Sequence, residues 1–307
     1  MIHRPAFGGL PTRAGVSPSC VSLPGGDWPT ITDFLLQRFP AIARDVWLAR
    51  MAGGEVVDEF GEAVHAERAY KGHMRVYYYR ALPAEERIPF DEVLLFQDDH
   101  LVAVDKPHFL PVTPSGHYLQ ESLLVRLKNR LGIDALSPLH RIDRETAGVV
   151  LFSVKPQERA AYQDLFRQRE VQKYYEAIAP WRDDLVFPRT CRSRIVEGQP
   201  FFRQAEVDGP PNSETHIEVL EVKGKLARYG LSPITGKKHQ LRVHMHALGL
   251  PLVNDRVYPP LDPTPDDDYR FPLQLLAQSI SFDDPFTGQR RQFTSRQRLE
   301  LPSSANL

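Results

Sequence analysis

Hydrophobic and polar positions near the amino end predict a small unit of two helices and short strands. Residues 33–40 and 44–51 follow a helical period, and a glycine pair at 53 and 54 ends the second helix. Residues 55–58 and 74–80 are β-prone, and the aromatic side chains of the second run alternate between two faces. Residues 1–28 are rich in proline, glycine and serine, which predicts a loosely ordered arm.

The rest of the chain is dominated by expected strands, at 92–96, 101–105, 147–154, 171–179, 215–222, 226–231 and 273–282. Helices are expected at 121–131, after Pro156, and at 239–248 before Gly249. The strict strand and helix alternation of a doubly wound sheet is missing, and no internal repeat of fixed period is found. A linker at 81–89 separates the two parts, so the expected division is an arm at 1–28, a small domain at 29–82 and a main domain at 83–307.

The composition is that of an ordinary globular protein. The chain has 307 residues, of which 42% are hydrophobic and 25% charged, and 38 basic against 39 acidic side chains leave a net charge of −1. Its apolar runs are far shorter than the roughly 18 residues that cross a bilayer, and no secretory signal is recognised. Cys20 and Cys191 cannot make a disulfide framework or a four-ligand zinc site, which predicts unpaired thiols in the cytoplasm.

The neutral total conceals two basic segments. Residues 185–245 hold ten Lys and Arg against six acidic residues, and residues 122–144 hold five against two. Such clusters can form a phosphate-binding face on a neutral protein, or they can be a solvated helix surface. Charge alone leaves both interpretations open.

One short segment has the character of a catalytic site. Residues 140–148 place two arginines around Asp143 and then run into an apolar strand. A carboxylate held between cations stays ionised at neutral pH, as a nucleophile or a base must. Taken alone, the same residues fit a surface turn with a local ion pair equally well.

Residues 140–148 resemble the His-Arg-Leu-Asp-Arg-x-Thr-Ser-Gly signature of RluA-type pseudouridine synthases, with Ile142 and Ala147 as departures. Residues 101–107 with 111–114 are similar to the family's opening strand and loop, and residues 173–177 to its Lys-x-Tyr-x-Ala strand. Residues 235–244 and 247–251 resemble its Thr-Gly-Arg-Thr-His-Gln-Leu-Arg-x-His helix, with two lysines replacing Arg-Thr. The resemblance covers about 90–285 and implies an α+β fold, a mixed, mainly antiparallel sheet flanked by helices and loops, with an RNA cleft. Leu276 stands where these enzymes often have His.

The resemblance also implies roles for single residues. Asp143 is expected to be the catalytic aspartate, Tyr175 the tyrosine stacked on the target base, and Arg242 the cation paired with the aspartate. Moving uracil from a nitrogen to a carbon glycosidic bond needs no redox change, and the resemblance implies that neither cofactor nor metal is required. The carboxylate either attacks the anomeric carbon or removes the 2′ proton, and both routes remain open. The expected RNA-binding residues are His140, Arg141, Arg144, Lys173, Lys237, Lys238, His239, Gln240, Arg126, Lys128, Arg130, Arg192 and Arg194.

Residues 29–80 resemble the small RNA-binding domain, named after a ribosomal protein, that often precedes this catalytic domain. The usual basic helix is reduced here to Arg38, Arg44 and Arg50, so the segment either still helps to hold RNA or serves as a structural cap. The expected partner is ribosomal or transfer RNA with a flipped uridine, bound by a monomer that has no membrane or protein partner. Which RNA and which uridine it modifies is not readable from the sequence.

Other chemistries are less well supported. Five residues separate Gly230 from Gly236 where a phosphate loop requires four, and no Gly-x-Gly-x-x-Gly is present. The histidines at 239, 244 and 246 do not share one helical face, which argues against a metal site. A retaining glycosidase needs a second carboxylate about 5 Å from Asp143, a geometry that cannot be assigned to Glu145 from sequence. The strongest alternative is an RNA-binding or RNA-assembly factor with the same cleft but no turnover.

Overall fold

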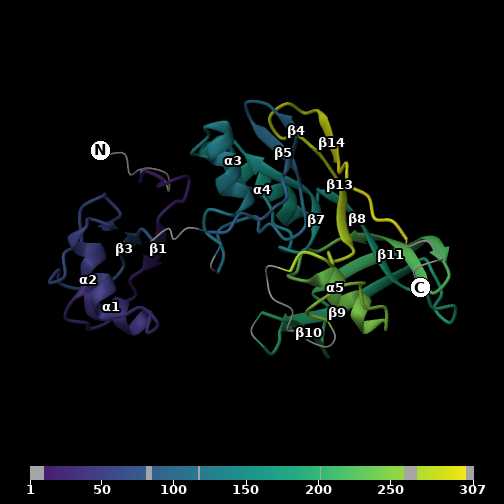
Figure 1. Cartoon of the computed structure of the whole chain (residues 1–307), viewed down its shortest axis with the longest axis horizontal. Coiled ribbons are helices and arrows are strands. Elements are labelled where there is room, and N and C mark those ends of the chain that lie inside the picture. Colours follow the sequence, from purple (N-terminus) through teal and green to yellow (C-terminus); the bar gives the residue numbers. More distant parts are fainter. Residues whose placement is uncertain (1–9, 81–84, 117, 201, 259–267, 302–307) are drawn as a thin grey trace. The chain divides into compact units, whose positions relative to one another are not determined.

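The computed structural model describes residues 10–80, 85–116, 118–200, 202–258 and 268–301. The chain divides into two compact units, which Figure 1 shows in colours that follow the sequence. The first comprises Met1–Glu85 and Lys128–Asp134, and the second Glu86–Leu127 and Ala135–Leu307. The expected domain boundary at residues 82 and 83 lies outside the described residues.

In its described residues the first unit contains two complete helices, α1 (Ile31–Arg38) and α2 (Arg44–Ala52), and a three-stranded sheet. The sheet has the order β1 (Ser19–Ser22), β3 (Arg75–Tyr78), β2 (Val56–Asp58), and both pairs are antiparallel. The side chain of Thr30 caps α1, and Asp33 returns a hydrogen bond to the backbone of Thr30. Strands and helices bury a common apolar core around Trp47.

Strand β1 corrects the expectation of a loosely ordered arm over residues 1–28. Val21 and Leu23 are buried in the core around Trp47, and the backbone of Ser19–Ser22 pairs with β3. The segment is rich in proline, glycine and serine and its apolar residues follow no period, so its own pattern does not predict a strand. The partner strand supplies the hydrogen bonds that order it.

The second unit is built on one sheet, which is mixed and mainly antiparallel, as the family resemblance implies. Within the described residues it has 11 strands, nine of them in the order β10, β9, β11, β12, β8, β13, β7, β5, β4, while β14 pairs with β13 and β6 with β7. Only the pairing of β13 with β7 is parallel in this part of the structure. The bounds are β4 Val93–Gln97, β5 Leu101–Lys106, β6 Ser137–Pro138, β7 Ala147–Ser153, β8 Gln172–Pro180, β9 Arg189–Glu197, β10 Gln204–Val207, β11 Ser213–Lys223, β12 Leu226–Pro233, β13 Leu275–Asp283 and β14 Arg290–Thr294.

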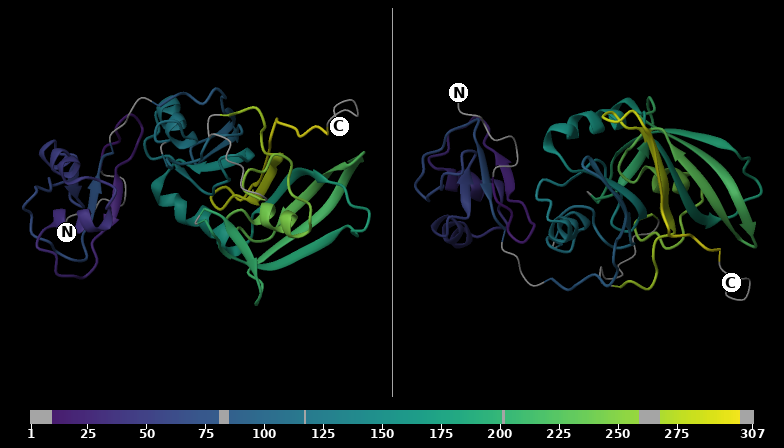
Figure 2. Two further views of the ribbon diagram at one scale, coloured as in Figure 1. Left: turned by 60° about the horizontal axis from the view of Figure 1, so that its bottom comes forward. Right: turned by 90° about the horizontal axis from the view of Figure 1, so that it is seen from above.

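Three further α-helices are found among the described residues. They are α3 (Leu123–Leu131), whose last four residues belong to the first unit, and two helices of the second unit, α4 (Arg159–Gln168), which follows a 3-10 turn at Pro156–Glu158, and α5 (Gln240–Ala247). Helix α5 packs against β9, β10 and β11, and the views in Figure 2 show it beside these strands. The buried residues Leu241 and Met245 of α5 join residues of β8 and β12 in one apolar core cluster. This packing fixes where the side chains of α5 emerge.

Gly148 is required where β7 runs parallel to β13. Its φ is +115°, and a Cβ atom at this position would lie 2.2 Å from the backbone oxygen of Ala277. We expect Gly148→Ala to lower the free energy of unfolding by about 3 kcal/mol, because the neighbouring strand must move. Gly288 also has a positive φ, +67°, but it faces open space, so Gly288→Ala is the control and should cost about 1 kcal/mol. Urea denaturation measures both variants, and equal losses would contradict the steric argument.

Candidate active site

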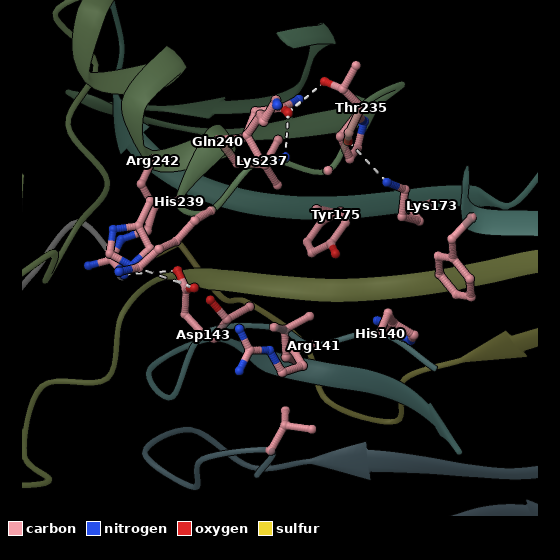
Figure 3. Close-up of a pocket in the computed structure, with 18 of the residues that line it drawn as sticks. His140, Arg141, Asp143, Lys173, Tyr175, Thr235, Lys237, His239, Gln240 and Arg242 are labelled. Atoms are coloured by element: carbon pink, nitrogen blue, oxygen red, sulfur yellow. Dashed lines mark hydrogen bonds and ion pairs between the residues drawn. The ribbon is translucent and has the colours of Figure 1, made fainter. Parts of the chain in front are cut away.

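A cleft of about 830 Å³ lies in the second unit. Its walls come from the loops before β7, the end of α4, strand β8, and the loop that joins β12 to α5. Asp143 comes from a loop, Tyr175 from β8 and Arg242 from α5, and Figure 3 shows all three beside the cleft. The fold thus brings the three expected catalytic residues to one place.

Asp143 is an ionised carboxylate with a hydrogen-bond donor on one oxygen atom and an imidazole ring near the other. Arg242 Nη1 donates a hydrogen bond to Oδ2 at 3.0 Å, and His239 Nε2 lies 3.7 Å from Oδ1 (Figure 3). Burial acts to raise the pKa of Asp143, but the charge and hydrogen bond of Arg242, together with its other neighbours, outweigh it and hold the pKa below its ordinary value. The side chain keeps 23% of its surface exposed. A reactive anion is therefore accessible from the cleft.

Arg242 is held in place from the side opposite Asp143. Its Nε and Nη2 atoms donate to the two oxygens of Asp255 at 2.8 and 2.7 Å, and Nη1 lies 3.8 Å from Glu145 Oε2. Only 1% of the side chain is exposed. Burial acts to lower the pKa of Arg242, but Asp255 and Asp143 outweigh it and raise the pKa above its ordinary value. Arg242 is thus a permanent cation with a fixed orientation.

Tyr175 presents an aromatic ring to the cleft. Figure 3 shows the ring projecting from β8 toward the loop that carries Arg141 and Asp143. Burial, together with the charge of Asp143, raises the pKa of Tyr175 above its ordinary value. The side chain is therefore a neutral phenol at physiological pH, with a face suited to stacking on a base.

His239 is the residue that precedes α5, and its backbone is left-handed, with φ 55° and ψ 16°. Its Nδ1 atom lies 2.9 Å from the hydroxyl of Tyr258. That hydroxyl also accepts a hydrogen bond from the backbone N–H of Gln204 at 2.8 Å. The ring of His239 therefore bridges the buried Tyr258 and the catalytic candidate Asp143.

The structure brings eight of the expected RNA-binding residues to the cleft: His140, Arg141, Arg144, Lys173, Lys237, Lys238, His239 and Gln240. Three of these, Arg141, Lys237 and Lys238, are exposed cations at its rim. Lys173 donates to the backbone oxygen of Thr235 at 3.1 Å, and burial lowers its pKa to about 8. The exposed cations are therefore the best placed to meet phosphates.

Two of the eight residues support the walls of the cleft. His140 Nε2 accepts a hydrogen bond from the backbone N–H of Leu151 at 3.2 Å, and burial lowers the pKa of His140 to about 3. The amide oxygen of Gln240 accepts hydrogen bonds from Thr235 Oγ1 at 2.6 Å and from the backbone N–H of Lys237 at 3.1 Å. His140 is thus neutral, and Gln240 shapes the loop before α5.

The other five expected RNA-binding residues, Arg126, Lys128, Arg130, Arg192 and Arg194, do not line this cleft. Arg126 donates to the backbone oxygens of Ile88 and Phe90 at 2.8 and 2.7 Å, and its side chain is 11% exposed. Lys128 is also buried, whereas Arg130 is exposed. The exposed basic face expected along α3 is therefore reduced, because the side chains of Arg126 and Lys128 are largely buried. Arg192 pairs with Glu214 at 3.0 Å on the surface.

Sequence analysis missed three residues that organise the site: Lys106, Asp255 and Tyr258. Lys106 is fully buried and donates to the backbone oxygens of Pro107, Leu110 and Arg144 at 2.9, 2.8 and 3.0 Å. Burial lowers the pKa of Lys106 to about 7, against the opposing effect of the nearby carboxylates. A lysine within an apolar strand was the available signal for Lys106. Asp255 and Tyr258 follow the apolar run 250–253, and nothing local distinguishes them from surface residues.

The described residues contain no group of three or more His, Cys, Asp and Glu side chains arranged to hold a metal ion. In the same residues no helix is long and apolar enough to cross a membrane. Cys20 and Cys191 are both free thiols, as the sequence predicts.

Comparison with known proteins gives a consistent result. Residues 100–247 match the family described as RNA pseudouridylate synthase. The dual-specificity RNA pseudouridine synthase RluA of Haemophilus influenzae is 31% identical over 66% of this chain and 92% of its own length. The mitochondrial tRNA pseudouridine(32) synthase of Saccharomyces cerevisiae is 30% identical over 54% of this chain, but the match spans only 36% of the yeast protein.

A solved structure shares the fold as well. The human protein RNA Pseudouridylate Synthase Domain Containing 4 has a TM-score of 0.52 and 27% identity, covering 68% of this chain and 88% of the human one. Sequence, fold and the order of the motifs therefore agree. The chain belongs to the RluA-type pseudouridine synthases and is an RNA pseudouridine synthase, an isomerase.

Proposed function

We propose that this enzyme converts specific uridines in ribosomal or transfer RNA to pseudouridine, with Asp143 as the catalytic residue. The observation that carries the proposal is the accessible Asp143 carboxylate, which Arg242 holds ionised in the same cleft as Tyr175. Relatives whose names specify tRNA or dual specificity support the class of substrate. We also propose that the protein is a monomer and that it acts in the cytoplasm. The two free thiols support a reducing compartment, although the yeast relative is named as mitochondrial.

The geometry suits a base that leaves its sugar and rejoins it through another atom. A uridine flipped out of the RNA places its ribose near Asp143, whose anion either attacks the anomeric carbon or removes the 2′ proton. Arg242 balances the charge of Asp143 and fixes its orientation. Tyr175 stacks on the detached uracil while the base rotates. Because its pKa is raised, Tyr175 is better suited to stacking than to removing the proton from carbon 5.

Tritium release from RNA labelled at carbon 5 of uridine tests the proposal, because the isomerisation replaces the hydrogen on that carbon. Ribosomal and transfer RNA are assayed separately, and the modified positions are then mapped. Release that depends on Asp143 is the expected result. If the folded protein binds these RNAs without releasing tritium, the alternative of a non-catalytic RNA-binding or assembly factor is favoured.

Lys237 and Lys238 are expected to contact RNA phosphates from the rim of the cleft. Each change, Lys237→Ala or Lys238→Ala, should weaken RNA binding and reduce the slope of log affinity against log salt by about one, because one phosphate contact is lost. Filter binding over a range of salt concentrations measures both quantities. Lys225→Ala serves as the control, because Lys225 is exposed but does not line the cleft. An unchanged slope in the rim variants would remove these lysines from the interface.

The same salt titration tests whether the first unit helps to hold RNA, which we also propose. Arg38 and Arg44 are exposed on its helices, whereas the guanidinium of Arg50 lies 5.3 Å from the ring centre of Trp47. Arg38→Ala combined with Arg44→Ala should therefore weaken binding modestly. Unchanged affinity would favour a structural cap.

A further inference from the structure

The imidazole ring of His239 connects the catalytic candidate to a buried tyrosine. Its Nε2 atom lies 3.7 Å from Asp143 Oδ1, and its Nδ1 atom lies 2.9 Å from the hydroxyl of Tyr258. The two nitrogen atoms lie at different positions on the ring, so each contact constrains its orientation. Any group that fixes the proton on one nitrogen also decides what the other offers to Asp143.

The hydrogen bonds of Tyr258 determine which nitrogen carries the proton. The Tyr258 hydroxyl accepts a hydrogen bond from the backbone N–H of Gln204 at 2.8 Å, and its only other hydrogen-bond partner within the described part of the chain is His239 Nδ1. If Nδ1 carried the ring proton, the buried hydroxyl hydrogen of Tyr258 would have no acceptor among the described residues, so the satisfied arrangement is that Tyr258 donates to Nδ1. Burial lowers the pKa of His239, although Asp143 opposes the shift, so the ring is neutral. The ring proton of neutral His239 therefore sits on Nε2 and points to Asp143.

We propose that Tyr258 and His239 are positioning residues for Asp143: Tyr258 fixes the tautomer of His239, and His239 then presents its Nε2–H to Oδ1 of the carboxylate. This inference rests on the proposed catalytic role of Asp143. Arg242 already donates to Oδ2, so the two oxygens would have separate donors and the carboxylate plane would be fixed. The present 3.7 Å is too long for a hydrogen bond, and catalytic contacts of this kind commonly shorten when substrate binds.

The backbone near Tyr258 supports both groups that face Asp143, Arg242 and His239. Asp255, which binds Arg242, also accepts hydrogen bonds from the backbone N–H groups of Val257 and Tyr258 at 2.8 and 3.1 Å. One carboxylate therefore supports both the arginine and the turn that carries Tyr258. His239 adopts a left-handed backbone, which is strained for a non-glycine residue. Such strain is found where a side chain must be aimed at a site.

The tautomer is tested first, by 15N NMR of the full chain labelled at histidine. His239→Asn identifies the His239 signals by their loss. We expect the wild type to show an unprotonated Nδ1 and a protonated Nε2, and Tyr258→Phe to shift protons toward Nδ1. A wild-type ring protonated at Nδ1, or signals that Tyr258→Phe leaves unchanged, would overturn the inference.

Single-turnover tritium release then tests the effect on the reaction. Tyr258→Phe should slow the step about five- to tenfold, the equivalent of one neutral hydrogen bond, with RNA affinity within about twofold. His239→Asn should slow it more, because Asn tolerates the left-handed backbone but has no atom at the position of Nε2. The double variant should be no slower than His239→Asn alone, since Tyr258 acts only through His239. Independent, additive losses would overturn the proposed connection.

Tyr229→Phe is the matched control. Tyr229 is fully buried, and its hydroxyl donates to the backbone oxygen of Pro180 at 2.8 Å, away from His239. This change removes a comparable hydrogen bond, and we expect it to leave both the NMR signals of His239 and the reaction rate unchanged. Asp143→Asn separates the two claims. If it is inactive while Tyr258→Phe and His239→Asn match the wild type, only the present inference fails. If it remains active, the proposed function itself fails.

Discussion

Asp143→Asn is expected to reduce pseudouridine formation at least about a thousandfold while leaving RNA affinity within about twofold. Asparagine keeps the shape of the side chain, and its amide oxygen can still accept the hydrogen bond that Arg242 now gives to Oδ2 at 3.0 Å. It has no negative charge, so it can neither attack the anomeric carbon nor remove a proton from the ribose. Tritium release measures the turnover of the variant, and filter binding measures its affinity for the same RNA.

Asp283→Asn is the matched control for this experiment. Asp283 also pairs with an arginine, Arg290, at 3.4 Å, but 76% of its side chain is exposed and it lies outside the cleft. The same chemical change there should leave turnover intact. Normal turnover by a folded Asp143→Asn variant would reject Asp143 as the catalytic residue.

Arg242→Met is expected to damage both stability and catalysis. Asp255 is 1% exposed and would lose the cation that binds both of its oxygens. Removing one partner of a buried ion pair costs about 3–5 kcal/mol, because the remaining charge is left uncompensated. The pKa of Asp143 should also rise, because Arg242 is the main group that lowers it against the effect of burial. Urea denaturation and tritium release measure the two effects separately.

A second substitution distinguishes these effects. Arg242→Met combined with Asp255→Asn no longer leaves the Asp255 charge unpaired, so it should recover part of the lost stability. It should not recover turnover, because Asp143 still lacks the donor on Oδ2. Recovery of turnover together with stability would show that Arg242 acts through folding alone.

The elements that the sequence predicts best are those with strong local patterns. The apolar run at 147–154 and the leucines of 121–131 correspond to β7 and α3 within two residues at each end. Strands β9, β10 and β14 were missed, because their residues are largely polar and each is ordered by its neighbour in the sheet. The order of the strands was not predictable either, since hydrogen bonds between strands depend on which segments meet and not on their local composition.

The candidate site divides in the same way. The sequence by itself determined that Asp143 lies between two arginines and that His239 and Arg242 open a helix, because these are relations between near neighbours in the chain. The family resemblance implied that Arg242 pairs with Asp143, 99 positions away, and the tertiary structure shows the contact. Only the tertiary structure decided that Asp255 holds the arginine and that Tyr258 contacts the histidine. Burial decided the rest: it makes Arg126 and Lys128 interior residues, and it makes the charge of Asp143 dependent on its partners. Distance and burial arise when the sheet brings separate segments together, so a local pattern cannot contain them.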